Sequence, residues 1–142
     1  MIDINSEKDI KNLLEITVYF HDGLIKEGQV KNDTLYLYFE GEWGYDWELC
    51  FSGNVEHSID SFDPDDFDDP YWFHASIFFE DSYIYLVRDY ARNKSEINDK
   101  WYVKAKKLKY KIIKNDTKSK KGELWKRLCY ANFSSWLVCK IN

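Results

Sequence analysis

The sequence predicts a single α+β domain, residues 1–142, built mostly from antiparallel β-sheet. Aromatic residues make up 18% of the chain, and these residues suit half-buried pleated surfaces. Residues 35–41, LYLYFEG, alternate between two faces with the period of a strand. Short polar turn sequences recur between such segments. We therefore expect roughly seven to nine strands in a sandwich or a partly closed barrel, with short helices near both ends.

The N-terminal part predicts one helix and then a meander. Ser6 with Asp9 is typical of a capping box and predicts a helix over residues 7–14. Gly23 is expected to take positive φ in a turn that follows the first strand. Three strands of an antiparallel meander are predicted: EITVYF (15–20), LIKEGQV (24–30) and LYLYFEG (35–41). A fourth strand is expected at 47–51, continued by residues 54–59 past a bulge or kink at Gly53.

The second half predicts a hairpin and a basic strand. Residues 72–81 and 82–90 form the hairpin, with its turn at 80–82. Residues 101–113 are predicted as a strand with one lysine-rich face and a slip near Lys106–Lys107, and an amphipathic helix is the alternative. The remaining segments are predicted as a basic loop, a short helix and a last strand: residues 114–122, 123–131 and 134–141.

The net charge of −5 conceals an uneven distribution along the chain. Residues 40–69 carry eleven Asp or Glu and no Lys or Arg, whereas residues 92–127 carry fourteen Lys or Arg and four acidic residues. Blocks of like charge are typical of solvated segments or of surfaces that meet a partner of opposite charge. The sequence therefore predicts one acidic and one basic region.

Membrane insertion and export are not expected. The chain has no apolar run near the roughly 20 residues that span a bilayer. Its first residues, MIDINSEKDIKN, lack the basic and apolar regions of a signal peptide. The chain has three cysteines, an odd number, and no CxxC motif. This usage is typical of free thiols in a reducing compartment. We expect a cytoplasmic protein.

The segment IDSFDPDDFDDPYWFHA, residues 59–75, is the strongest candidate site. As a calcium loop beginning at Asp63 it fails, because position 5 is Phe67, position 6 is Asp68 and position 12 is His74. A solvated loop and a partner surface remain, and the interleaved aromatic residues favour the partner surface. The predicted partner-binding residues are Asp63, Asp65, Asp66, Phe67, Asp68, Asp69, Tyr71 and Trp72.

Other chemistry is less favoured by the sequence. His21–Asp22 is a possible metal pair, although the strand-turn context favours a structural role. The cysteines have no neighbouring base, and no P-loop, GxSxG or GxGxxG occurs. The basic run 100–127 contains aromatic residues that could stack on nucleic acid bases. The overall pI near 5.2 argues against nucleic acid binding. The alternative is that the basic run neutralises the acidic loop. We predict no enzyme activity, no cofactor and no metal.

Residues 16–41, ITVYFHDGLIKEGQVKNDTLYLYFEG, resemble the opening of several small uncharacterised bacterial domains. In these domains a strand ends in FHD and two further strands follow, and some of them resemble immunity proteins of polymorphic toxin and contact-inhibition systems. The resemblance implies an intracellular β-rich protein encoded near a toxin, and it gives no catalytic role to Phe20, His21 or Asp22. The sequence thus predicts a non-catalytic protein that occludes a basic protein partner, with a small-ligand-binding domain and a metal-dependent hydrolase as alternatives.

Overall fold

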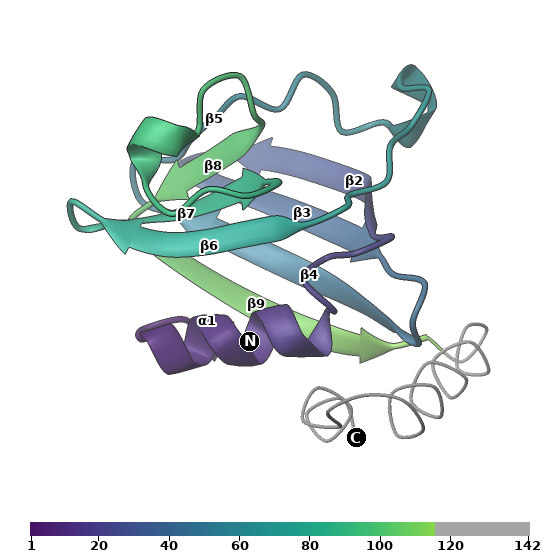
Figure 1. The fold of residues 1–142 in the computed structure, drawn as a ribbon, viewed down its shortest axis with the longest axis horizontal. Coiled ribbons are helices and arrows are strands. Elements are labelled where there is room, and N and C mark those ends of the chain that lie inside the picture. Colours follow the sequence, from purple (N-terminus) through teal and green to yellow (C-terminus); the bar gives the residue numbers. More distant parts are fainter. Residues whose placement is uncertain (116–142) are drawn as a thin grey trace.

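The computed structural model describes residues 1–115, which form two open antiparallel sheets and one α-helix (Figure 1). The five-stranded sheet has the order β1-β9-β4-β3-β2, with β1 (Ile2–Asp3), β9 (Lys107–Lys114), β4 (Tyr45–Ser52), β3 (Thr34–Glu40) and β2 (Leu24–Lys31). The four-stranded sheet has the order β5-β8-β7-β6, with β5 (Glu56–His57), β8 (Tyr102–Ala105), β7 (Tyr83–Arg88) and β6 (Ala75–Glu80). The predicted antiparallel, β-rich fold is confirmed.

A core of aliphatic and aromatic side chains joins the two sheets. On β3, Leu35, Leu37 and Phe39 are buried, as the alternation predicted. They pack in one cluster with buried residues of the four-stranded sheet, among them Leu86 and Val103. The two sheets therefore form the layers of a sandwich, whose core is filled by side chains from both.

The hairpin of β6 and β7 has the position that the sequence predicted. Glu80 pairs with Tyr83 across a two-residue turn, and both turn residues, Asp81 and Ser82, have positive φ. Two successive positive φ values are typical of a type I′ turn, whose twist matches that of the flanking strands. The short turn fixes the register of the whole hairpin.

Helix α1 (Glu7–Ile16) begins as predicted, since the Ser6 side chain accepts a hydrogen bond from the Asp9 N–H. The prediction of a strand at 15–20 is wrong, because the helix continues to Ile16 and a tight turn follows. Val18, Tyr19 and Phe20 have φ values of 54°, 56° and 62°. Such left-handed backbone is costly for these residue types, and the complete burial of Phe20 in the core offsets that cost.

One assignment in this turn also needs correction, namely the positive φ expected at Gly23. The residue with positive φ is Asp22, at 62°, and Gly23 does not have it. Gly23 is needed for space instead, because a Cβ there would lie 2.7 Å from the Trp47 ring. Glycine therefore lets the indole of Trp47 pack directly against the backbone.

The chain changes sheet at two places where the sequence suggested irregular strands. At Gly53, with φ of 84°, the chain leaves β4 and enters β5 in the other sheet, so the expected continuation past a bulge is wrong. The predicted slip near Lys106–Lys107 is the break between β8 and β9. The Lys106 N–H donates to the Gly53 carbonyl, so these two crossings are hydrogen bonded to each other. The helical alternative for 101–113 is wrong.

The loop of residues 60–69 lies apart from the lysine-rich strand β9, whereas the acidic residues of β4 lie beside β9, with Glu48 opposite Lys111. The loop between β5 and β6 contains the 3-10 helix η1 (Pro64–Asp66), which lies next to β2. The lysine-rich strand β9 is three strands away from β2, a distance of about 14 Å at the usual strand spacing. Among residues 1–115, no ion pair joins a carboxylate of residues 60–69 to Lys104, Lys107, Lys109 or Lys111. These four lysines therefore do not neutralise the loop of residues 60–69 by direct contact.

The predictions for residues 123–131 and 134–141, and most of the loop at 114–122, lie outside the described residues. Within residues 1–115, no helix has both the length and the apolar composition that a membrane-spanning helix requires.

Candidate functional site

The acidic loop, residues 60–69, presents its carboxylates to solvent. Five of its aspartates carry the predicted site, and all five are exposed: Asp63, Asp65, Asp66, Asp68 and Asp69. Their concentration on one surface follows from two Asp-Pro-containing turns, in which aspartate side chains replace the hydrogen bonds of regular structure. The loop is therefore a surface of negative potential rather than a buried polar site.

Local hydrogen bonds define the shape of the acidic loop. The Asp63 Oδ1 accepts from the Asp65 N–H at 2.9 Å and thereby begins η1. The Ser61 hydroxyl donates to the Asp66 carboxylate and accepts from the Asp63 N–H. The Asp69 Oδ1 accepts from the Tyr71 N–H at 3.1 Å. These bonds hold the backbone in a defined conformation while the carboxylates remain accessible.

Two aromatic side chains attach the acidic loop to the sandwich. The ring of Phe62 lies against Gly28 of β2, so closely that a Cβ at Gly28 would be 2.3 Å from the ring. The ring of Phe67 contacts the indole of Trp101 at a centroid distance of 5.1 Å. The purely solvated loop that the sequence left open is thus not what forms, because the loop has apolar contacts at both of these points.

Arg88, at the end of β7, holds the chain that leaves the acidic loop. Its Nη2 donates to the Tyr71 carbonyl at 2.8 Å and to the Asp69 carbonyl at 3.4 Å. Its guanidinium also lies over the rings of Trp72 and Trp101. Burial lowers the pKa of Arg88 below its ordinary value, and the charges of Asp69 and Asp89 oppose that effect. The arginine therefore acts as a structural tie between strand and loop.

The predicted aromatic anchors occupy three different environments. Trp72 is only 2% exposed and packs in the core against Phe20 and Phe39, so it is a core residue and its prediction as an anchor is wrong. Phe67 is half-buried because its ring faces Trp101. Tyr71 is 44% exposed and is the accessible member of the predicted set.

Two exposed aromatic residues lie outside the predicted partner-binding set. Phe73, at 69% exposure, is one of the interleaved aromatic residues of the acidic segment, and Tyr90, at 63%, was not singled out from the sequence. The His74 ring stacks on the Tyr90 ring at a centroid distance of 3.8 Å and on Tyr19 at 5.4 Å. The ring of His21 meets Phe73 edge-on at 5.4 Å. We call this group, His21, Phe73, His74 and Tyr90 with Tyr19 beside them, the aromatic patch.

The left-handed turn after α1 positions two residues of the aromatic patch, Tyr19 and His21. The turn directs Phe20 into the core. On either side of it, the Tyr19 ring contacts His74 and the His21 ring contacts Phe73. The His21 Nδ1 lies 3.0 Å from the Phe73 carbonyl, and the backbone of Trp72 bonds to that of Asp22 and Gly23. Burial lowers the pKa of His74, and the proximity of His21 lowers it further against the opposing charge of Asp89.

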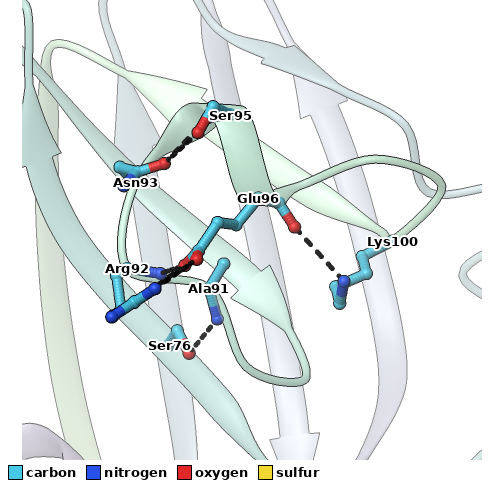
Figure 2. Close-up of polar contacts among 7 residues, drawn as sticks. All are labelled: Ser76, Ala91, Arg92, Asn93, Ser95, Glu96 and Lys100. Carbon is cyan, nitrogen blue, oxygen red and sulfur yellow. Dashed lines mark hydrogen bonds and ion pairs between the residues drawn. The ribbon is translucent and has the colours of Figure 1, made fainter.

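The loop that follows β7 contains Tyr90, and hydrogen bonds of the next residues hold this loop (Figure 2). The Ala91 N–H donates to the Ser76 hydroxyl on β6 at 3.0 Å. Glu96 accepts from the Arg92 backbone and guanidinium, with the shortest side-chain contact at 2.9 Å, and the Lys100 ammonium donates to the Glu96 carbonyl. The 3-10 helix η2 (Lys94–Glu96) lies inside this bonded loop. Tyr90 is therefore exposed on a loop that is held at both ends.

Two neighbouring hollows border the aromatic patch. One, of about 410 Å³, lies between the end of the acidic loop and the patch, and Asp69, Tyr71, Phe73, Asp89 and Asp99 are among the residues that line it. The other, of about 600 Å³, includes Tyr90 in its wall. Since Lys100 lines both, the hollows are adjacent. A third hollow of about 790 Å³ lies away from the patch, along β2 and β3, and Phe62 and Asp63 of the acidic loop also line it.

The His21–Asp22 pair is close in space, with the His21 Nε2 at 3.5 Å from the Asp22 carboxylate. Among residues 1–115, however, no group of three or more His, Cys, Asp or Glu side chains is arranged to hold a metal ion. His21 instead contributes to the aromatic patch through its ring.

Comparisons of the chain with protein-family models, with curated proteins and with solved structures give no match.

Proposed function

We propose that the chain is a non-catalytic binding protein that uses the acidic loop to occlude a basic protein partner, in the manner of an immunity-type inhibitor. The observation that carries this proposal is the exposure of the five aspartates on a backbone that is tied to the sandwich by Phe67 and Arg88. A preformed acidic surface loses little conformational entropy on binding, which is the condition for tight inhibition.

The charge arrangement supports fast and oriented association. A cluster of exposed carboxylates raises the rate at which a cationic partner meets the loop, and this effect weakens as salt screens the charges. The lysines of β9 lie away from the loop, beyond β3 and β4. A cationic partner therefore meets attraction at the loop and repulsion at the β9 edge.

Paired affinity captures test the proposal. Wild type and the variant Asp65→Lys/Asp68→Lys serve as baits in extract of the source cells at low salt, and mass spectrometry identifies proteins that only wild type captures. The identified partner should be basic. Its association rate with wild type should fall steeply with salt, and the variant should bind it at least about tenfold more slowly.

A second charge variant, Asp3→Lys/Glu7→Lys, is the matched control. Both variants change the net charge from −5 to −1, because each of the two substitutions adds two charges. Asp3 and Glu7 are exposed near β9 and α1, away from the acidic loop. If both variants slow association equally, only net charge matters and the loop assignment is wrong. If the partner is not basic, the proposed function itself is wrong.

A further inference from the structure

We propose that the aromatic patch binds an arginine side chain of the basic partner, with the guanidinium on the rings of Phe73 and Tyr90 and beside the carboxylates of the 410 Å³ hollow. This inference rests on the proposed function, because it assigns the anchor of the same complex. It differs from the sequence prediction, which placed the anchors at Phe67, Tyr71 and Trp72.

The exposure of Phe73 and Tyr90 is the first argument. Both rings are more exposed than Tyr71. The Phe73 ring meets His21 edge-on, and the Tyr90 ring stacks on His74, which follows Phe73 in the chain. Isolated exposed apolar residues are ordinary, whereas contiguous ones mark interaction surfaces. Aromatic residues on a firmly held surface are the residue types that dominate binding energy.

The charges of the hollow are the second argument. Asp69, Asp89 and Asp99 line it together with the cations Arg88 and Lys100. Both cations already donate to backbone carbonyls, Arg88 to Tyr71 and Lys100 to Glu96. These bonds hold the two cations in place but leave them charged, so three carboxylates against two cations give the hollow an excess of one negative charge beside the Phe73 ring. That combination suits a guanidinium, which stacks flat on aromatic rings and is accepted bidentately by a carboxylate.

The strained backbone around the patch is the third argument. Val18, Tyr19, Phe20 and Asp22 all have positive φ, and so does Asp89, at 87°. Non-glycine residues in this conformation are costly and cluster at ligand-binding positions. Here the two strained segments contribute Tyr19, His21 and the residue before Tyr90 to one surface. Five of the ten non-glycine residues with positive φ among residues 1–115 therefore lie in the two segments beside the proposed anchor.

Labelled polyarginine and polylysine peptides of equal length test the inference, with affinity measured by fluorescence anisotropy at low salt. Wild type should bind both peptides and should bind polyarginine about two- to fivefold more tightly, the size expected of an exposed cation–π contact. Phe73→Ser and Tyr90→Ser should each reduce this preference while leaving polylysine binding unchanged. Both residues are exposed, so the variants should keep the wild-type melting temperature.

Two controls separate the possible outcomes. Phe79→Ser removes an exposed ring of β6 outside the patch and should keep the preference for polyarginine. The variant Asp65→Lys/Asp68→Lys should bind both peptides more weakly than wild type, and by the same factor. Equal binding of the two peptides by wild type, or a preference that survives both patch variants, overturns the anchor and leaves the acidic loop as the binding surface. Failure of wild type to bind either peptide overturns the proposed function as well.

Discussion

The ring of Phe67 meets the indole of Trp101 edge-on, at a centroid distance of 5.1 Å and an interplanar angle of 71°. Phe67 comes from the acidic loop and Trp101 immediately precedes β8, so this contact joins the most charged segment to the four-stranded sheet. Edge-on aromatic pairs contribute about 0.5–1.5 kcal/mol beyond the burial of their area.

The Phe67→Ala variant should release the acidic loop without unfolding the sandwich. Because the half-buried ring is lost, we expect the free energy of unfolding to fall by about 1–3 kcal/mol. Amide hydrogen exchange in residues 61–69 should accelerate more than exchange in β3. Phe79→Ala, which removes an exposed ring elsewhere, should leave exchange in the loop unchanged. Unchanged loop exchange in Phe67→Ala would show that other contacts fix the loop.

Gly28 and Phe62 should show strong energetic coupling. A Cβ at Gly28 would lie 2.3 Å from the Phe62 ring, so Gly28→Ala must displace the ring and should destabilise the protein by about 1–3 kcal/mol. In a Phe62→Ala background the same substitution should be neutral or stabilising, because alanine is favoured over glycine in a strand by about 0.5–1 kcal/mol. Chemical denaturation of the four proteins gives the coupling energy. An equal cost of Gly28→Ala in both backgrounds would contradict the contact.

His74 should make stability fall as the solution becomes acidic. Burial lowers its pKa in the folded protein below the ordinary value of 6.5, and Asp89 opposes this while His21 adds to it. The unfolded chain then binds more protons between the two pKa values, so stability is lost as pH falls through 6.5 toward the folded value. His74→Phe should remove this slope from denaturant midpoints measured between pH 8 and 5. Retention of the full slope would assign it to other groups.

Glu96 should contribute stability that depends on its charge. Its hydrogen bonds with Arg92 lower the Glu96 pKa from 4.5 to about 2. Because the folded pKa is depressed, the contribution is complete above 4.5 and is lost as pH falls toward 2. Wild type should therefore be more stable than Glu96→Gln at pH 7, and the two should converge near pH 2. A difference that does not change with pH would contradict the ionic character of the pair.

The sequence predicted the structure correctly where the local pattern of residues and the tertiary environment favour the same conformation. The alternation of Leu35, Leu37 and Phe39 predicted the buried face of β3. The slip at Lys106–Lys107 was visible because the buried positions change from odd to even numbers, with Ala105 before the slip and Leu108 after it. What the pattern could not give was its cause, a change of sheet between β8 and β9.

Prediction failed where tertiary contacts override local preference. Val18, Tyr19 and Phe20 favour extended backbone, but the burial of Phe20 holds them in a left-handed turn. Trp72 and Phe73 are adjacent and similar, so which ring faces inward depends on the path of the chain at Gly23, whose backbone bonds to Trp72. The acidic loop could be predicted from composition. The aromatic patch could not, because its residues come from three segments that are distant in the sequence.

Within residues 1–115, the separation of the acidic loop from the lysines of β9 across the five-stranded sheet contributes an electric dipole moment. Near a cationic target, such a moment produces a torque that turns the loop toward the target before any atoms touch. The rotational search then shortens, because encounters begin in productive orientations. A uniformly charged molecule with the same net charge of −5 would be attracted equally strongly but would arrive in random orientation.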